Sequence, residues 1–134
     1  MSITEDYVSF EVAKLLKEKG FNVETEHKIW YVVKPYSTGT QFNSITYGVG
    51  ETTREYSKEH CILMPTHQMA LKWLREVHGI FISVISCTYP TLNKVTWTPD
   101  ITTFEAVFPD SVIECNTYEE ACETAIKYCL ENLI

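Results

Sequence analysis

The sequence predicts an α+β fold in which three helices pack on a mainly antiparallel sheet. Three segments have the apolar spacing of amphipathic helices, and they begin near residues 4, 65 and 117. The segments between them, at 28–34 and 80–98, are rich in β-branched and aromatic residues. They do not alternate regularly with helices, as the strands of a parallel α/β protein would. We expect residues 1–134 to form one domain, since this length is typical of a single domain.

The first helix is predicted to begin at Thr4, because threonine is a good N-cap residue. Gly20 is expected to end it, since glycine takes the left-handed conformation found after helices, and Phe21 is expected to fold back in a Schellman-type contact. The buried stripe of this helix consists of apolar residues at helical spacing, which are Val8, Val12, Leu15 and Leu16.

The segment after the first helix is less regular. Residues 28–34 are apolar on both faces of the expected strand, which is typical of a central strand. Residues 36–60 form an irregular middle stretch. Within them we expect a strand at 41–49 and a loop at 48–53, followed by a short apolar segment at 61–64.

The middle helix has clear signals at both ends. Pro65 cannot continue a helix from upstream, Thr66 is a good N-cap, and Gly79 can end the helix in a left-handed conformation. We expect Trp73 to be a core anchor, and the alternative is an aromatic binding platform. The apolar stripe is formed by Met69, Ala70, Trp73, Leu74 and Val77.

Residues 80–89 give the strongest strand signal in the sequence. A turn is predicted at 90–93, a partner strand at 94–98 and a third strand at 101–108. We expect the three helices to cover one face of a sheet that contains 28–34, 80–89 and 94–98. The last helix opens with a capping box made by Thr117 and Glu120. Its apolar stripe is formed by Cys122, Ile126, Cys129 and Leu133, flanked by Ala121 and Ala125.

Charge and cysteine usage limit the classes of function. The net charge is −7, and residues 79–134 hold Lys94 and Lys127 against eight acidic residues. That part of the chain is a poor surface for phosphate backbones. No run of about 18 apolar residues predicts a membrane span, and the N-terminus does not have the pattern of a signal peptide. Five widely spread cysteines favour free thiols and a cytoplasmic location.

Three stretches, at residues 7–21, 65–80 and 118–130, together resemble a family of small uncharacterised proteins. These proteins are encoded by gut Bacteroidales and by their phages or mobile elements. The resemblance covers mostly the predicted helices, and residues 36–60 match no motif of the family. It implies a phage-related or mobile-element-related cytoplasmic setting. The family provides no activity and no catalytic residues for this chain.

Motifs for phosphate and metal binding are incomplete. Gly48-x-Gly50 follows a possible strand, but a third glycine and a following helix are missing, so a plain turn is the alternative. Metal binding would use His60, Cys61 and His67, which do not have the spacing of a structural zinc site. The alternative is that Cys61 is a small buried apolar residue. We therefore predict no metal site and no cofactor.

Motifs for catalysis are equally weak. Cys122 and Cys129 lie on an apolar helix face, so we expect them to be buried and inert, whereas Cys87 and Cys115 are less clear. A pair of carboxylates for hydrolysis could come from the acidic cluster in the first turns of the last helix. The alternative is that these residues only stabilise the helix, because negative charge is favourable near a helix N-terminus. That cluster consists of Glu119, Glu120 and Glu123. No catalytic residue is predicted.

The strongest functional signal is a group of aromatic and basic residues in the irregular middle stretch. Tyr and Arg are enriched at protein interfaces, and we expect an interaction surface formed by Tyr36, Tyr47, Arg54 and Tyr56. The alternative is that Tyr47 packs under the loop. The leading hypothesis is a non-enzymatic module that binds an unknown protein partner. A second hypothesis is an enzyme of unrecognised type, with a pocket beside residues 36–60.

We predict that the chain alone does not bind nucleic acid, because eighteen acidic residues outnumber eleven basic ones. The alternative is a basic patch formed in three dimensions by Lys28, Lys34, Arg54 and Lys58. Fluorescence anisotropy with labelled single- and double-stranded DNA and RNA at low salt is the test, since electrostatic binding is strongest there. Saturable binding at micromolar protein that weakens steeply as salt rises would contradict the prediction.

Overall fold

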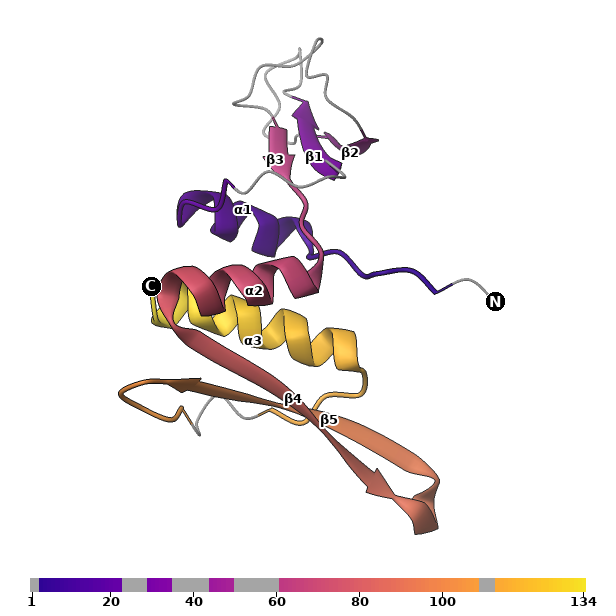
Figure 1. The fold of residues 1–134 in the computed structure, drawn as a ribbon. Coiled ribbons are helices and arrows are strands. Elements are labelled where there is room, and N and C mark those ends of the chain that lie inside the picture. The colour runs from indigo at the N-terminus through magenta and orange to yellow at the C-terminus, as the bar shows by residue number, and fades with distance from the viewer. Residues whose placement is uncertain (1–2, 23–28, 35–43, 50–60, 109–112) are drawn as a thin grey trace. The chain divides into compact units, whose positions relative to one another are not determined.

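The computed structural model describes residues 3–22, 29–34, 44–49, 61–108 and 113–134 (Figure 1). The chain divides into two compact units. One unit comprises Tyr7–Pro65, and the other comprises Met1–Asp6 with Thr66–Ile134. The prediction of one domain over 1–134 stays a prediction.

The unit Tyr7–Pro65 begins with helix α1, Phe10–Glu18. The predicted start at Thr4 is wrong, because the N-cap is Ser9, whose Oγ accepts a hydrogen bond of 3.2 Å from the backbone N–H of Val12. The predicted end is confirmed. Gly20 has a φ of +92°, and the N–H of Phe21 donates to the carbonyl of Leu16 at 2.9 Å, which is the hydrogen bond of a Schellman motif.

Three strands of this unit form an antiparallel sheet in the order β2-β1-β3. Strand β1 is Ile29–Lys34, β2 is Ser44–Val49 and β3 is Cys61–Leu63. The prediction that the first strand is central is confirmed, since β1 pairs with β2 on one side and with β3 on the other. Helix α1 packs against β3. The expected loop at Gly48 and Val49 is wrong, because both residues belong to β2.

The second unit opens with helix α2, His67–His78, and both predicted ends are confirmed. The Oγ1 of Thr66 accepts a hydrogen bond of 3.2 Å from the backbone N–H of Met69. Gly79 follows in the left-handed conformation, with φ 64° and ψ 31°. A side chain at this position would be strained, so glycine fixes the point at which the helix turns into the next strand.

Strands β4, Ile80–Tyr89, and β5, Lys94–Thr103, form an antiparallel ribbon with ten paired positions on each strand. The turn between them is the 3₁₀ helix η2, Pro90–Leu92, followed by Asn93 with a φ of 49°. The partner strand is longer than the predicted 94–98, because it continues through Pro99. Proline has no N–H, so it is tolerated where that N–H is not needed for the ladder.

The chain after β5 folds back along the outer edge of that strand. The predicted third strand at 101–108 is therefore wrong, since residues 101–103 belong to β5. Val107 forms an isolated bridge with Thr102, and the N–H of Phe108 donates to the carbonyl of Ile101 at 3.0 Å. Further along, Trp97 and Cys115 exchange two backbone hydrogen bonds, of 2.9 and 2.7 Å. Segments on both sides of residues 109–112 thus cover the β5 edge.

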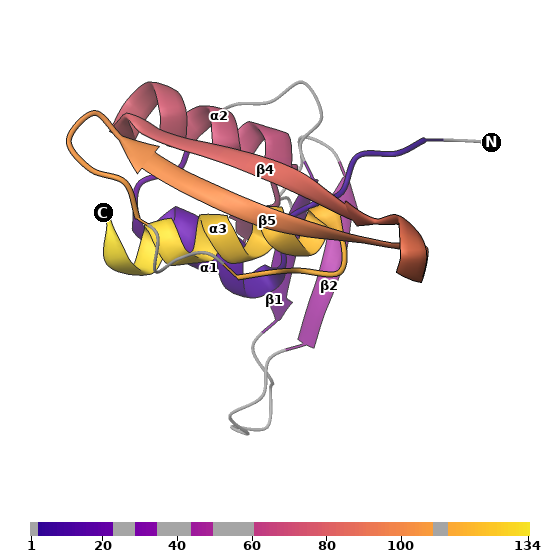
Figure 2. The same cartoon turned by 90° about the horizontal axis from the view of Figure 1, so that it is seen from below.

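Helix α3, Tyr118–Asn132, completes the unit. The Oγ1 of Thr117 accepts from the N–H of Glu120, as the capping box predicts, but the Glu120 carboxylate accepts from the N–H of Asn116 instead of Thr117. Helices α2 and α3 pack on one face of the ribbon, with α2 against β4 and α3 mainly against β5 (Figure 2). The far end of the ribbon, with η2, extends beyond both helices (Figures 1 and 2).

The α+β class and the antiparallel pairing are confirmed for the described residues, which contain three α-helices. The expectation that 28–34, 80–89 and 94–98 share one sheet is wrong, because β1 belongs to a different sheet from β4 and β5. Periodicity identifies a strand and its apolar faces, but it does not specify which strand will be its neighbour.

The predicted core residues of the helices are mostly buried. Trp73 is 7% exposed and is confirmed as a buried residue, and its ring lies edge-on to that of His78. The prediction that Val77 belongs to the buried stripe is wrong, since this side chain is 61% exposed in the last turn of α2. Helical spacing gives the direction of a side chain, but not how far the neighbouring elements extend over it. In α3 the buried residues are Ala121, Cys122, Ala125, Ile126, Cys129 and Leu130.

Replacing Trp73 with alanine is expected to destabilise the fold by about 3–5 kcal/mol, the usual cost of deleting a buried large aromatic side chain. Urea denaturation followed by circular dichroism measures this change. Val77→Ala is the matched control in the same helix, and it should cost less than about 0.5 kcal/mol because the side chain is exposed. A Trp73→Ala change below about 1 kcal/mol would contradict the assignment of Trp73 to the core.

Candidate functional site

The predicted interaction surface falls mostly on residues that the structure does not describe. Tyr36, Arg54 and Tyr56 lie outside the described residues. Tyr47 lies in β2, at the position opposite Tyr31 of β1. The interaction surface formed by these residues therefore stays a prediction. The described residues contain a different candidate, which is built on the ribbon of β4 and β5.

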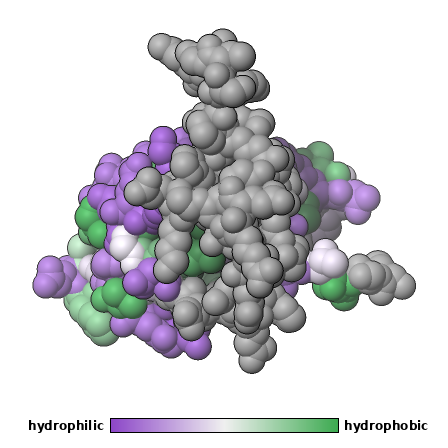
Figure 3. Space-filling view, turned by 90° about the horizontal axis from the view of Figure 1, so that it is seen from above, coloured by the Kyte–Doolittle hydropathy of each residue, from purple (hydrophilic) through white to green (hydrophobic). Residues whose placement is uncertain are grey.

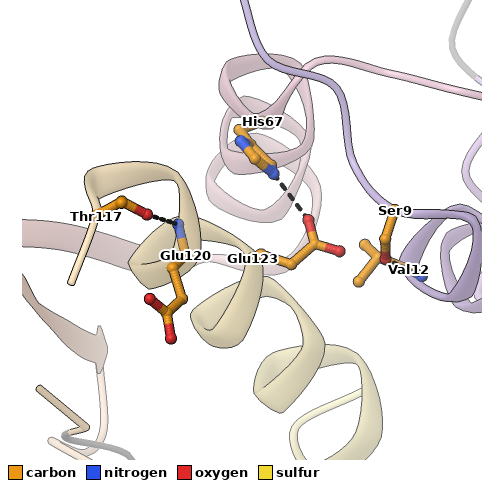
Figure 4. A network of polar contacts seen from close by, with 6 residues as sticks. All are labelled: Ser9, Val12, His67, Thr117, Glu120 and Glu123. Atoms are coloured by element: carbon orange, nitrogen blue, oxygen red, sulfur yellow. Dashed lines mark hydrogen bonds and ion pairs between the residues drawn. The ribbon is translucent and has the colours of Figure 1, made fainter. Parts of the chain in front are cut away.

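One residue of the acidic cluster in the last helix, Glu123, links α3 to α2. The carboxylate of Glu123 lies 2.7 Å from Nε2 of His67 (Figure 4). His67 is buried, and this contact joins the first turn of α2 to the middle of α3. Gln68 donates to the hydroxyl of Tyr118 at 3.0 Å nearby. His67, a candidate metal ligand by sequence, thus has a carboxylate as its partner.

The thiols are mostly inaccessible. Cys122 and Cys129 are buried as predicted, and burial raises the pKa of both, that of Cys129 to about 12. Burial also raises the pKa of Cys115. Thiolate is the nucleophilic form of cysteine, so a raised pKa disfavours reaction at these three thiols. Cys87, on β4, is exposed.

The described residues contain neither a metal site nor a membrane-spanning helix. No group of three or more His, Cys, Asp or Glu side chains in them is placed to hold a metal ion. In the same residues, no helix combines the length and the apolar character needed to cross a membrane. On the face in Figure 3, the visible described residues are mostly hydrophilic, with hydrophobic residues in smaller groups between them.

The candidate site is the edge of β4 that faces away from β5. Within the described residues, β4 and β5 form a sheet of two strands, so no described strand pairs with β4 on this edge. β4 is ten residues long and contains no charged residue, no proline and no glycine. Natural sheets usually protect a free edge with lysine, proline, a bulge or a covering segment. Strand β4 contains neither lysine nor proline, and its unbroken register with β5 has no bulge.

The two edges of the ribbon therefore differ. The edge of β5 is covered at Trp97 by Cys115 and at Thr102 by Val107. Strand β5 also contains Lys94, Pro99 and Asp100, while β4 has no charged residue and no described strand on its other edge. An edge of this kind offers backbone N–H and C=O groups to a further strand, which is the basis of β-strand addition.

Exposure increases along β4 towards the turn. Ile80 is buried, whereas all five residues from Ile85 to Tyr89 are exposed. Ile85 is 55% exposed, and Leu92 in the turn is 70% exposed. Strand β4 is thus covered near Ile80 and exposed in its half near the turn. The half near the turn presents apolar side chains to the solvent.

A polar cluster holds the covering segment on the β5 edge. The Glu114 carboxylate accepts hydrogen bonds from the hydroxyls of Thr96, at 2.5 Å, and Tyr89, at 3.1 Å. These bonds lower the pKa of Glu114, because they stabilise the ionised carboxylate. The pKa of Tyr89 is raised, first by its hydrogen bond with Cys87 and then by its hydrogen bond with Glu114. The cluster lies on the ribbon near its turn.

The sequence predicted the strand at 80–89 but did not mark it as a candidate site. The signal was the absence of charge over ten consecutive residues in a chain with 22% charged residues. A strand of this composition is also typical of a central position, buried on both sides. Only the pairing of the strands shows that β4 is an edge.

Comparison with known protein families, with curated proteins and with solved structures finds no match for this chain. The resemblance to the Bacteroidales and phage family stays a prediction. The function must therefore be inferred from the chemistry of the site itself.

We expect Glu114→Gln to loosen the segment 113–116 from β5, because the neutral amide is a weaker acceptor for Thr96 and Tyr89. Hydrogen exchange should then be faster at the amides of Trp97 and Cys115. Lower pH should have the same effect on the wild type: the folded-state pKa is lowered, so the stabilisation is present at neutral pH and lost as pH falls through that pKa. Unchanged exchange in Glu114→Gln, with Glu119→Gln as control, would contradict this role.

Proposed function

We propose that the chain is a small non-enzymatic protein-interaction module that binds an extended strand along the free edge of β4. The observation that carries this proposal is the difference between the two edges of the ribbon. The outer edge of β5 is covered by residues after that strand, while the ten uncharged residues of β4 have no described strand on the edge that faces away from β5.

The chemistry of β4 supports protein as the ligand. Strand addition takes its affinity from backbone hydrogen bonds and its selectivity from the alternate side chains of the edge. On β4 these side chains are apolar or small and polar, such as Ile85, Ser83 and Cys87. A phosphate ligand would need Lys or Arg beside the edge, and the nearest strand offers only Lys94.

The biological setting belongs to the same proposal. The resemblance to small proteins of Bacteroidales and their phages or mobile elements supports a role in contacts between phage-derived and host proteins. The five cysteines, with no disulfide expected among them, support a cytoplasmic location. The surface predicted at Tyr36, Tyr47, Arg54 and Tyr56 would be a second contact region of this module.

Ile85→Lys is expected to reduce capture of the partner about tenfold, since lysine on a strand edge removes apolar contact and opposes a further strand. The tagged full chain is purified from the cells that encode it, and captured proteins are quantified by mass spectrometry. Leu92→Lys is the matched control, because it changes an exposed apolar residue in the turn and leaves the edge intact. Circular dichroism verifies that both variants are folded.

Equal capture by the wild type and Ile85→Lys would contradict the use of the β4 edge. Loss of capture in both Ile85→Lys and Leu92→Lys would also contradict it, because the effect would then follow added charge and not the edge.

A further inference from the structure

We propose that the strand bound by the β4 edge is β4 of a second copy of this chain, paired antiparallel about a twofold axis. This inference rests on the proposed function and names its partner. The ribbons of two copies would then form one continuous sheet in the order β5-β4-β4-β5. Two-fold dimers of this kind use the same surface on both subunits, so the edge must be complementary to itself.

The charge distribution favours a second copy. Each chain has a net charge of −7, so two copies repel each other unless they meet at a neutral surface. β4 is neutral over its whole length of ten residues. Because it has neither basic nor acidic residues, pairing with itself brings no like charges face to face. An edge that had evolved to bind a charged partner would carry the opposite charge.

The faces of the ribbon define the arrangement of the two copies. Residues opposite each other in a ladder point to the same face. Val84 lies opposite the buried Pro99, and Ile82 lies opposite the buried Ile101, so these residues point to the helices. The alternate residues of β4 point away from the helices, and they are Phe81, Ser83, Ile85, Cys87 and Tyr89. A twofold axis perpendicular to the sheet keeps the helices of both copies on one face.

The partial cover of the ribbon favours an antiparallel pair. The helices of each copy cover β4 near Ile80 but leave the half from Ile85 to Tyr89 exposed. Antiparallel pairing about the middle of β4 places the exposed half of each copy beside the covered half of the other. The helix layer of the second copy then lies next to the bare half of the first ribbon. The same two-fold arrangement therefore reduces exposure in both copies.

The exposed apolar side chains indicate the register. With Ile85 on the axis, the two Ile85 side chains lie opposite each other on the outer face. In the same register, Phe81 of one copy lies opposite Tyr89 of the other, and Ser83 lies opposite Cys87. This register joins the most exposed apolar residue of β4 to itself, which is a favourable cross-strand pair.

A charge-swap experiment tests the partner and the register together. Sedimentation velocity of the purified full chain over a range of concentrations should show a reversible dimer. Ile85→Lys and Ile85→Glu should each weaken dimerisation about tenfold or more, because each variant places two like charges side by side on the axis. An equimolar mixture of the two variants should restore the dimer, since lysine then lies opposite glutamate. Leu92→Lys should dimerise like the wild type.

Restoration by mixing also excludes misfolding as the cause of the loss, because misfolded variants would not recover. A wild type that stays monomeric at concentrations of several hundred micromolar would overturn the inference. So would a dimer that is insensitive to both Ile85 variants, or one that is lost in both but not restored in the mixture. If the pure chain is monomeric while Ile85→Lys still abolishes capture of another protein, the self-pairing fails and the proposed function stands.

Discussion

The ladder between β4 and β5 is the constraint on which the unit formed by Thr66–Ile134 depends. An isolated pair of strands is only marginally stable in water, so the ribbon needs cover on at least one face. Helices α2 and α3 provide it, and the contact between His67 and Glu123 joins them. The end of the ribbon that carries the turn extends beyond both helices (Figures 1 and 2). That part must therefore be stabilised in another way.

The covering segment and the free edge are two solutions to the same problem. On the β5 side, Cys115 exchanges two backbone hydrogen bonds with Trp97. The Glu114 carboxylate accepts hydrogen bonds from Thr96 and Tyr89, which hold the same segment on the ribbon. On the β4 side, no described residue performs this task, and the strand has no charge to discourage pairing. A fold that protects one edge with several hydrogen bonds and leaves the other neutral is therefore suited to accept a further strand.

Local signals in the sequence were sufficient for the features that are determined locally. Thr66 and Gly79 bound α2 as predicted, and Phe21 closes α1, because caps depend on residues a few positions apart. The start of α1 was wrong because Thr4 and Ser9 are both good caps, and the choice depends on where the chain meets other segments. Likewise, the partner strand was predicted at 94–98, although β5 continues through Pro99 to Thr103.

The candidate site could not be predicted because an edge is a property of topology and not of composition. The sequence of β4 would suit a central strand equally well, and it is an edge strand in the described residues because the chain after β5 returns on the opposite side. The contact between His67 and Glu123 could not be predicted either, because 56 positions separate the two residues and only the fold brings them together. What the sequence does contain is the absence of charge from Ile80 to Tyr89. A single lysine or glutamate in this strand would oppose the pairing of a further strand with its edge. The absence of charge from β4, in a chain that is acidic overall, therefore keeps this edge able to pair.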